Sequence, residues 1–107
     1  MPNPRERAHF IDLPEPGERM RVRFSTVAGD VVAFTVQYET TVDGEPVPVA
    51  RYDSQHGMPH RDKLNRSGEV IEKVWLPMTN ADALDLGIAD FRTNWQRYKT
   101  AFLGDSQ

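Results

Sequence analysis

Polar and apolar residues alternate along residues 19–27, which read RMRVRFSTV. In an extended chain this alternation sends the apolar residues to one side and three arginines to the other. Residues 31–41 are rich in β-branched and aromatic side chains, and a Gly-Asp turn separates them from the first segment. We therefore expect a β-hairpin with one apolar face. Its apolar positions are Met20, Val22, Phe24, Val32, Phe34, Val36 and Tyr38.

Two further strands are expected in the middle of the chain. Residues 47–53 follow an Asp-Gly turn, and Pro48 places this strand at a sheet edge or at a bulge. Residues 54–68 are polar and are interpreted as a connection. Residues 69–77, EVIEKVWLP, predict a fourth strand that ends at a proline.

The clearest element is an amphipathic helix near the C-terminus. Thr79 and Asn80 are candidates for its N-cap, and Gly104 is suited to its end. Gly87 would allow a close approach to the sheet. The apolar stripe, with spacings of four and three residues, comprises Leu84, Ile88, Phe91, Trp95, Tyr98 and Phe102. We expect these side chains, Trp95 and Tyr98 included, to form much of the core.

The N-terminal segment differs from the rest because it contains four prolines among residues 1–18. We interpret residues 1–18 as an extended, irregular arm and residues 19–107 as a single domain. The predicted fold class is α+β: an antiparallel meander of about four strands with one long C-terminal helix packed on one face. The other face of the sheet is then left to solvent or to a partner.

Composition narrows the class of protein. A chain of 107 residues forms one domain, and its net charge of −3 does not indicate a globally basic nucleic-acid binder. The absence of cysteine excludes disulfides and thiolate metal sites. No apolar run reaches the roughly 18 residues of a membrane span, and the N-terminus lacks the apolar stretch of a signal peptide. We expect a cytoplasmic protein without a membrane partner.

The stretch RYDSQHGMPHRD, residues 51–62, is the strongest candidate site. Its two histidines can move protons near neutral pH, and its arginines can hold a phosphate and stabilise charge on it. In this interpretation His56 and His60 act as general acid and base, Arg51 and Arg61 bind phosphate, and Tyr52 positions the substrate. This chemistry requires no cofactor.

Two alternatives remain open for the same stretch. Asp53, His56, His60 and Asp62 offer nitrogen and oxygen ligands to a divalent metal. Metal binding is not favoured, because Gly57 and Pro59 oppose the helix that a His-x-x-x-His pair normally needs. The plainer alternative is a polar hairpin turn with solvated histidines.

The arginine stripe of residues 19–23 is the second candidate. Arg19, Arg21 and Arg23 share one side of their strand, which is either a solvated face or a surface that binds phosphates of a substrate. The sequence contains no phosphate-cradling glycine loop, nucleophile elbow or dinucleotide fingerprint. ATPases, α/β-hydrolases and dehydrogenases are therefore excluded.

The block R-Y-D-x-x-H-G-x-x-H-R-D, followed by a strand and a helix with N-W-x-x-Y, resembles small bacterial proteins of unknown function. More distantly it resembles the TumE-type toxins of type II toxin–antitoxin modules, over residues 47–103. This resemblance implies a toxin-like ribonuclease that a helix-turn-helix antitoxin neutralises. The positions that match the motif are Arg51, Tyr52, Asp53, His56 and His60.

The leading hypothesis is thus a toxin-like protein that acts on RNA as a metal-independent ribonuclease. The alternative is a non-catalytic module that binds a partner through the open sheet face, and the third is a metal-dependent hydrolase. The partners considered are RNA, an antitoxin protein and a second copy of the chain.

Overall fold

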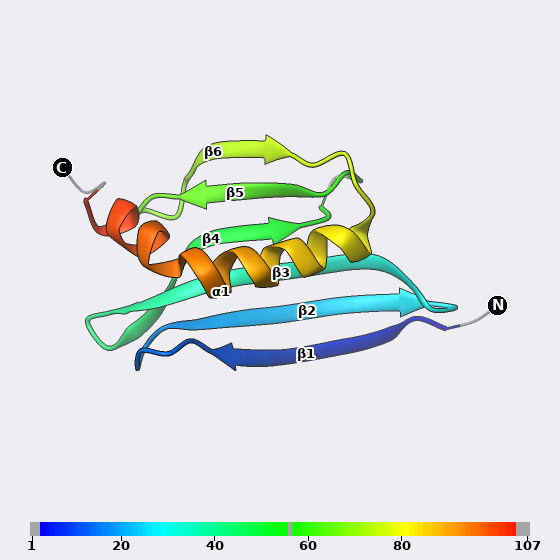
Figure 1. Cartoon of the computed structure of the whole chain (residues 1–107), viewed down its shortest axis with the longest axis horizontal. Coiled ribbons are helices and arrows are strands. Elements are labelled where there is room, and N and C mark those ends of the chain that lie inside the picture. The colour runs from blue at the N-terminus through cyan, green and yellow to red at the C-terminus, as the bar shows by residue number, and fades with distance from the viewer. Residues whose placement is uncertain (1–2, 56, 105–107) are drawn as a thin grey trace.

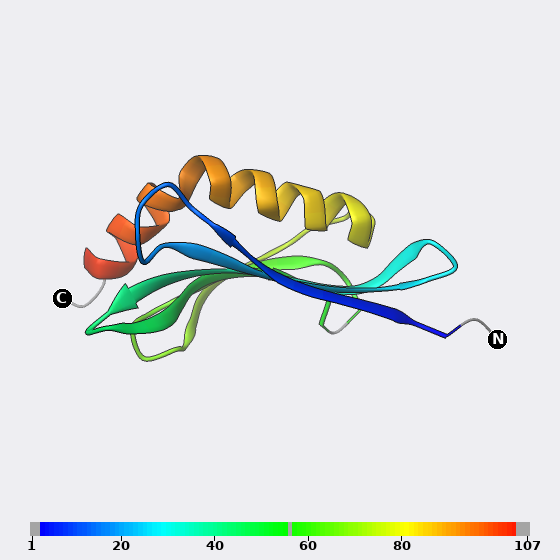
Figure 2. The same ribbon diagram turned by 90° about the horizontal axis from the view of Figure 1, so that it is seen from below.

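The computed structural model describes residues 3–55 and 57–104. Within these residues six strands form one antiparallel sheet in the order β1-β2-β3-β4-β5-β6, and one helix follows (Figure 1). The elements are β1 (Arg5–Asp12), β2 (Arg19–Val27), β3 (Asp30–Val42), β4 (Glu45–Asp53), β5 (His60–Leu64), β6 (Val70–Trp75) and α1 (Asn80–Gly104). The predicted class is confirmed: α1 packs on one face of an antiparallel meander (Figure 2).

The sheet has six strands, so the prediction of about four strands is wrong. The first additional strand, β1, lies inside the predicted arm and pairs with β2 along its whole length. It is an edge strand with exposed side chains on both faces, which is why RERAHFID shows no apolar alternation. Residues 5–12 therefore belong to the sheet and do not form an irregular arm.

The second additional strand, β5, lies inside the predicted polar connection 54–68. It pairs with β4 and β6, and its buried residues include His60 and Asp62. Because these two positions are polar, the alternation of buried and exposed residues in HRDKL does not appear as an apolar pattern.

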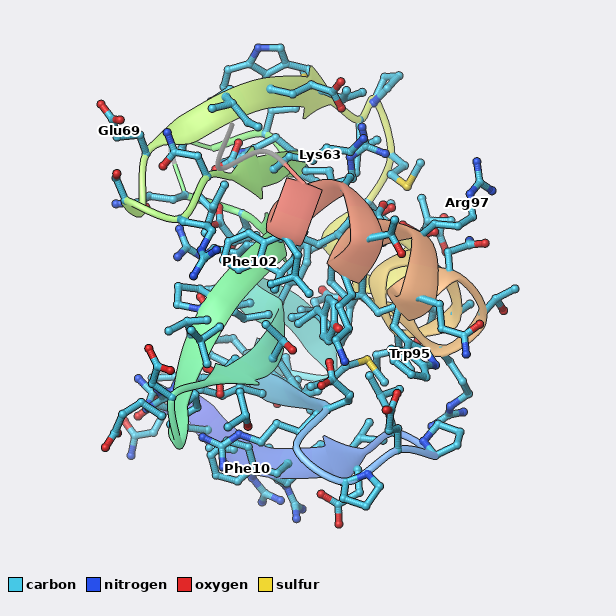
Figure 3. All side chains as sticks on the ribbon, turned by 90° about the vertical axis from the view of Figure 1, so that its left-hand side faces the viewer. Phe10, Lys63, Glu69, Trp95, Arg97 and Phe102 are labelled. Atoms are coloured by element: carbon cyan, nitrogen blue, oxygen red, sulfur yellow. The ribbon has the colours of Figure 1, made fainter. Side chains whose placement is uncertain are left out.

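The core lies between α1 and the sheet. The helical stripe is confirmed, because Leu84, Phe91, Trp95, Tyr98 and Phe102 are buried and Ile88 packs against them. In the view along the sheet, Phe102 points from the helix toward the strands (Figure 3). The sheet contributes Met20, Val22, Phe34, Val36, Tyr38, Val49, Ala50 and Tyr52.

One apolar position of the predicted hairpin is exposed. Val32 keeps 50% of its surface accessible, because the register between β2 and β3 shifts at Ser25/Thr26 and moves this residue out of the alternation.

The start of α1 and its approach to the sheet agree with the sequence. Thr79 caps the helix, since its hydroxyl accepts a hydrogen bond of 3.1 Å from the amide of Asp82. Gly87 faces the ring of Tyr52, so the expected close approach of helix and sheet is confirmed. Within the described residues, no helix has the length and apolar character that crossing a bilayer requires.

Candidate functional site

The strand alternation divides residues 51–62 between the two faces of the sheet. Arg51 pairs with Asp62 and Asp53 pairs with His60, while Tyr52 pairs with Arg61. Tyr52 and Arg61 contact residues of α1, so they lie on the helix face. Arg51, Asp53, His60 and Asp62 consequently lie on the opposite face, which we call the open face.

A buried ionic cluster occupies one part of the open face. His60 Nε2 lies 2.9 Å from Asp53 Oδ1 and 3.6 Å from Asp62 Oδ2, and the residue is only 2% exposed. Lys73 on β6 places its ammonium nitrogen 2.8 Å from Asp62 Oδ1. The ring of Trp75 packs 5.1 Å from that of His60, centroid to centroid. We call Asp53, His60 and Asp62 the Asp-His-Asp cluster.

The other nitrogen of the His60 ring also has an acceptor. Nδ1 lies 3.1 Å from the carbonyl oxygen of Met58, while Nε2 faces the carboxylate of Asp53. Both ring nitrogens therefore face oxygen atoms, so the ring is held between the backbone of Met58 and the two carboxylates. His60 is not a solvated loop residue, which corrects the interpretation of 51–62 as a plain polar turn.

The predicted arrangement of four residues around one phosphate does not form. His56 lies outside the described residues. Arg51 and Arg61 lie on opposite faces of the sheet because neighbouring strand residues alternate. His60 is buried, so a substrate on the surface cannot reach its ring directly. Three of the four candidate metal ligands, in contrast, do converge.

Tyr52 and Arg61 belong to a hydrogen-bond network on the helix face. The hydroxyls of Tyr52 and Tyr98 both donate to Asp90 Oδ2, the first over 2.7 Å, and Arg61 donates to the Tyr98 hydroxyl. Burial and the bond to Asp90 raise the pKa of Tyr98 to about 12. The same two causes raise the pKa of Tyr52 further. These residues hold α1 on the sheet and leave Tyr52 without access to a substrate.

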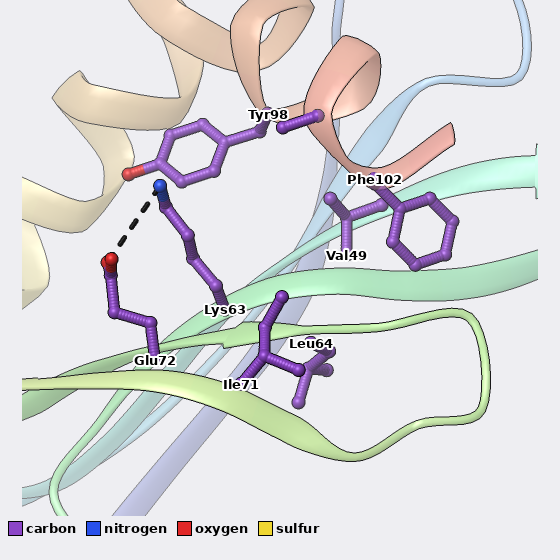
Figure 4. Close-up of a pocket in the computed structure, with 8 residues that line it drawn as sticks. Val49, Lys63, Leu64, Ile71, Glu72, Tyr98 and Phe102 are labelled. Atoms are coloured by element: carbon purple, nitrogen blue, oxygen red, sulfur yellow. Dashed lines mark ion pairs between the residues drawn. The ribbon is translucent and has the colours of Figure 1, made fainter. Parts of the chain in front are cut away.

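A groove runs between the C-terminal half of α1 and strands β5 and β6. Lys63 and Tyr98 line it, and Lys63 Nζ lies 3.8 Å from Glu72 Oε1 (Figure 4). Glu72 also pairs with Arg61. In the part of the chain that the structure describes, Lys63 and Arg61 therefore both have a carboxylate partner, unlike Arg21 and Arg23 of the open face.

The arginine stripe lies on the open face beside β3 and β4. Arg19 Nε donates to Glu39 over 2.8 Å, Gln37 donates to Glu39 over 2.7 Å, and Arg51 donates to Gln37 over 2.9 Å. This chain of contacts crosses β2, β3 and β4 and holds the side chains of Arg19 and Arg51 in place. Arg21 and Arg23 are exposed, and within the described residues their side chains have no hydrogen-bond or ion-pair partner.

Two adjoining hollows lie along these arginines. One, of about 280 Å³, is lined by Arg21, Arg23, Thr35 and Gln37. The other, of about 310 Å³, shares Arg23 and Thr35 and extends to Asp53, Ser54 and Gln55. Asp53 thus connects the arginine-lined surface with the Asp-His-Asp cluster.

Sequence reasoning missed the residues that complete this site on other strands. Lys73 and Trp75 on β6 stand opposite Asp62 and His60, and Thr35 and Gln37 on β3 stand opposite Arg23 and Arg21. A spacing of two residues was the available signal, since His60 and Asp62, and likewise Lys73 and Trp75, are two apart and so share one face of their strand.

Residues 4–107 match the family described as Domain of unknown function (DUF7718), and the chain belongs to that family. Searches of curated proteins and of solved structures find no match.

Proposed function

We propose that this member of the DUF7718 family binds single-stranded RNA on its open face, with Arg21 and Arg23 as the central phosphate contacts. The observation that carries the proposal is the pair of exposed, unpartnered arginines that line adjoining hollows on one sheet face. RNA is the substrate class that the resemblance to toxin-like ribonucleases implies.

The arginines are arranged to follow a backbone. Arg21 and Arg23 are two apart on β2, so they project from the same face about 7 Å from one another along the strand. Their neighbours Arg19 and Arg51 are held in place by Glu39 and Gln37. Preordered guanidinium groups bind phosphate with a smaller loss of side-chain entropy and with two parallel hydrogen bonds.

Exposed aromatic rings flank the arginines. Phe10 on β1 is 52% exposed and lies on the side of the sheet away from the helix (Figure 3). Trp75 on β6 is 49% exposed and stands on the same face as His60. Bases of a single strand stack on such rings, and this stacking is largely independent of sequence.

The direct test is fluorescence anisotropy with labelled single-stranded RNA. We expect the double variant Arg21→Glu/Arg23→Glu to lose binding. The control Arg92→Glu/Arg97→Glu changes the net charge equally at exposed positions of α1, on the other face of the sheet, and should bind like the natural chain. Replacement of both arginines by glutamine should reduce the slope of log Kd against log salt concentration by roughly 1.4, because each lost phosphate contact accounts for about 0.7.

Two outcomes of this test oppose the proposal. Equal loss of binding in both charge-reversal variants would mean that only net charge matters. Displacement of the RNA by polyglutamate at equal charge concentration would instead point to an acidic protein as the partner of the open face.

Cleavage of the bound RNA is a second candidate function, because Asp53 lines the larger hollow and also contacts His60. A carboxylate held by an imidazole is a pair that can transfer a proton. We expect Asp53→Asn to retain binding and to lose cleavage of labelled RNA. If expression of the natural chain arrests the growth of a bacterial host and Asp53→Asn relieves the arrest, the cleavage activity would be that of a toxin. If the RNA stays intact after incubation with the natural chain, cleavage is contradicted and RNA binding remains the proposed function.

A further inference from the structure

We propose that the Asp-His-Asp cluster is a binding site for a divalent transition-metal ion, and that zinc suits its donor atoms. The site would use Asp53, His60 and Asp62 only. The proposal is independent of RNA binding, because none of these three residues is among the proposed phosphate contacts. It is an alternative to the proton-transfer pair of Asp53 and His60 considered for cleavage, because the ion would contact the same atoms.

The donor atoms already have the spacing of metal ligands. One ligand atom from each of the three residues lies within 4.8 Å of the others. The two distances from His60 Nε2 to the carboxylates are 2.9 and 3.6 Å. Ligands at about 2.0–2.2 Å from one ion lie roughly 3–3.5 Å apart in octahedral or tetrahedral geometry. Both distances from His60 Nε2 are therefore close to the separation of ligands that share one ion.

The surrounding contacts orient the ligands as they do in metal sites. A histidine that binds a metal usually donates its second N–H to a carbonyl or carboxylate, which fixes the ring. His60 Nδ1 has such a partner in the carbonyl oxygen of Met58, so Nε2 points toward the two carboxylates. Asp53 Oδ1 accepts the amide of Gln55, and Lys73 contacts Asp62 Oδ1. A ring that donates from Nδ1 can offer the lone pair of Nε2 to the ion.

Burial supplies a second reason for a cation at this position. Asp53 and Asp62 are 5% and 4% exposed, and two carboxylates at this depth require compensation by positive charge. Of the two carboxylates, Lys73 contacts only that of Asp62, while the His60 ring contacts both. A divalent ion would compensate both carboxylates and would cross-link the ends of β4 and β5.

The donor set selects the class of ion. One imidazole nitrogen with two carboxylate oxygens is a set that zinc and manganese accept, and calcium, which prefers six or more oxygens, is disfavoured. Three protein ligands leave a coordination position for water or a substrate group. Because Asp53 also lines the larger open-face hollow, the cluster lies directly beside a cavity that opens to solvent.

Titration calorimetry of the chelator-treated full chain with zinc tests the site. We expect one equivalent to bind, and we expect Asp53→Asn and Asp62→Asn each to weaken binding by about 100-fold. The control His9→Ala removes an exposed histidine on β1 and should leave the affinity unchanged. A natural chain that binds no zinc, or aspartate variants that bind it with unchanged affinity, would overturn the proposal.

A measurement on the natural chain covers the case in which the aspartate variants fail to fold. The ring of Trp75 lies 5.1 Å from that of His60, centroid to centroid, whereas Trp95 of α1 is buried in the core between the helix and the sheet. We expect zinc to shift the NMR resonance of the Trp75 indole and not that of Trp95. Unchanged Trp75 resonances at saturating zinc would contradict the site. The Arg21→Glu/Arg23→Glu variant should bind zinc normally, so failure of RNA binding and failure of metal binding are distinguishable.

Discussion

A Cβ atom at position 87 would lie 2.9 Å from Cγ of Tyr52, so the backbone of α1 rests directly on this tyrosine ring. The hydroxyl of the same ring donates to Asp90 one turn further along the helix. Tyr52 therefore fixes both the distance and the rotation of α1 relative to β4. This contact explains why the tyrosine of the candidate stretch 51–62 is part of the core.

Replacement of Gly87 by alanine is predicted to destabilise the chain. The added methyl group would overlap the ring of Tyr52 and cost about 1–3 kcal/mol, against a gain of up to about 1 kcal/mol from better helix propensity. Urea unfolding measures the difference. Gly104→Ala is the control, since its Cβ would meet no atom within 4 Å. A Gly87→Ala variant as stable as the natural chain would show that α1 does not rest on Tyr52.

The three tyrosines predict a stability that falls in alkaline solution. Burial raises the pKa of Tyr98 to about 12, and burial with a carboxylate hydrogen bond raises that of Tyr52 and of Tyr38 further. A folded-state pKa above the unfolded value of about 10 means that the native state holds its proton more tightly. The stabilisation is complete below about pH 10; the share of Tyr98 is lost as the pH rises through about 12, and those of Tyr52 and Tyr38 are lost at higher pH.

Ultraviolet absorbance of tyrosinate checks this prediction. We expect the native chain to show almost no tyrosinate at about pH 10, where a urea-unfolded chain is half ionised. Tyr98→Phe should remove the first tyrosine to ionise. A native chain with half-ionised tyrosine at that pH would disprove the hydrogen-bonded burial of these rings.

Glu18 is predicted to be a structural carboxylate. It is 4% exposed, it accepts hydrogen bonds from the hydroxyls of Tyr38 and Thr40, and Lys99 of α1 lies 3.2 Å away. Glu18→Ala would leave the buried Tyr38 hydroxyl without its acceptor, at a cost of about 1–3 kcal/mol. Glu15→Ala is the matched control, because Glu15 is half exposed and its ion pair with Lys99 contributes little. Equal unfolding midpoints for the two variants would contradict this role.

The sequence predicted those elements whose burial is apolar. Alternation in β2 and the helical stripe of α1 both consist of side chains that pack into the core, so periodicity located them correctly. β1 and β5 escaped this reasoning for different reasons. β1 is exposed on both faces, and the buried side of β5 includes an imidazole and a carboxylate.

The sequence predicted which residues belong to the candidate site, but not how they are arranged. The sequence identified Asp53, His60 and Asp62 as neighbours in the chain, but their convergence depends on the pairing of β4 with β5. The same pairing moves Arg61 to the helix face and separates it from Arg51. Lys73, which lies 11 residues beyond Asp62 in the chain, joins the cluster only because β6 is the next strand of the sheet.

The central claim is that the open face binds RNA, and NMR titration of the labelled chain with single-stranded RNA tests it most directly. We predict that the largest shift changes fall on Arg21 and Arg23 of β2 and on Thr35 and Gln37 of β3, with the outer surface of α1 unaffected. Changes confined to α1 and the groove beside Lys63, or no changes at saturating RNA, would contradict the claim.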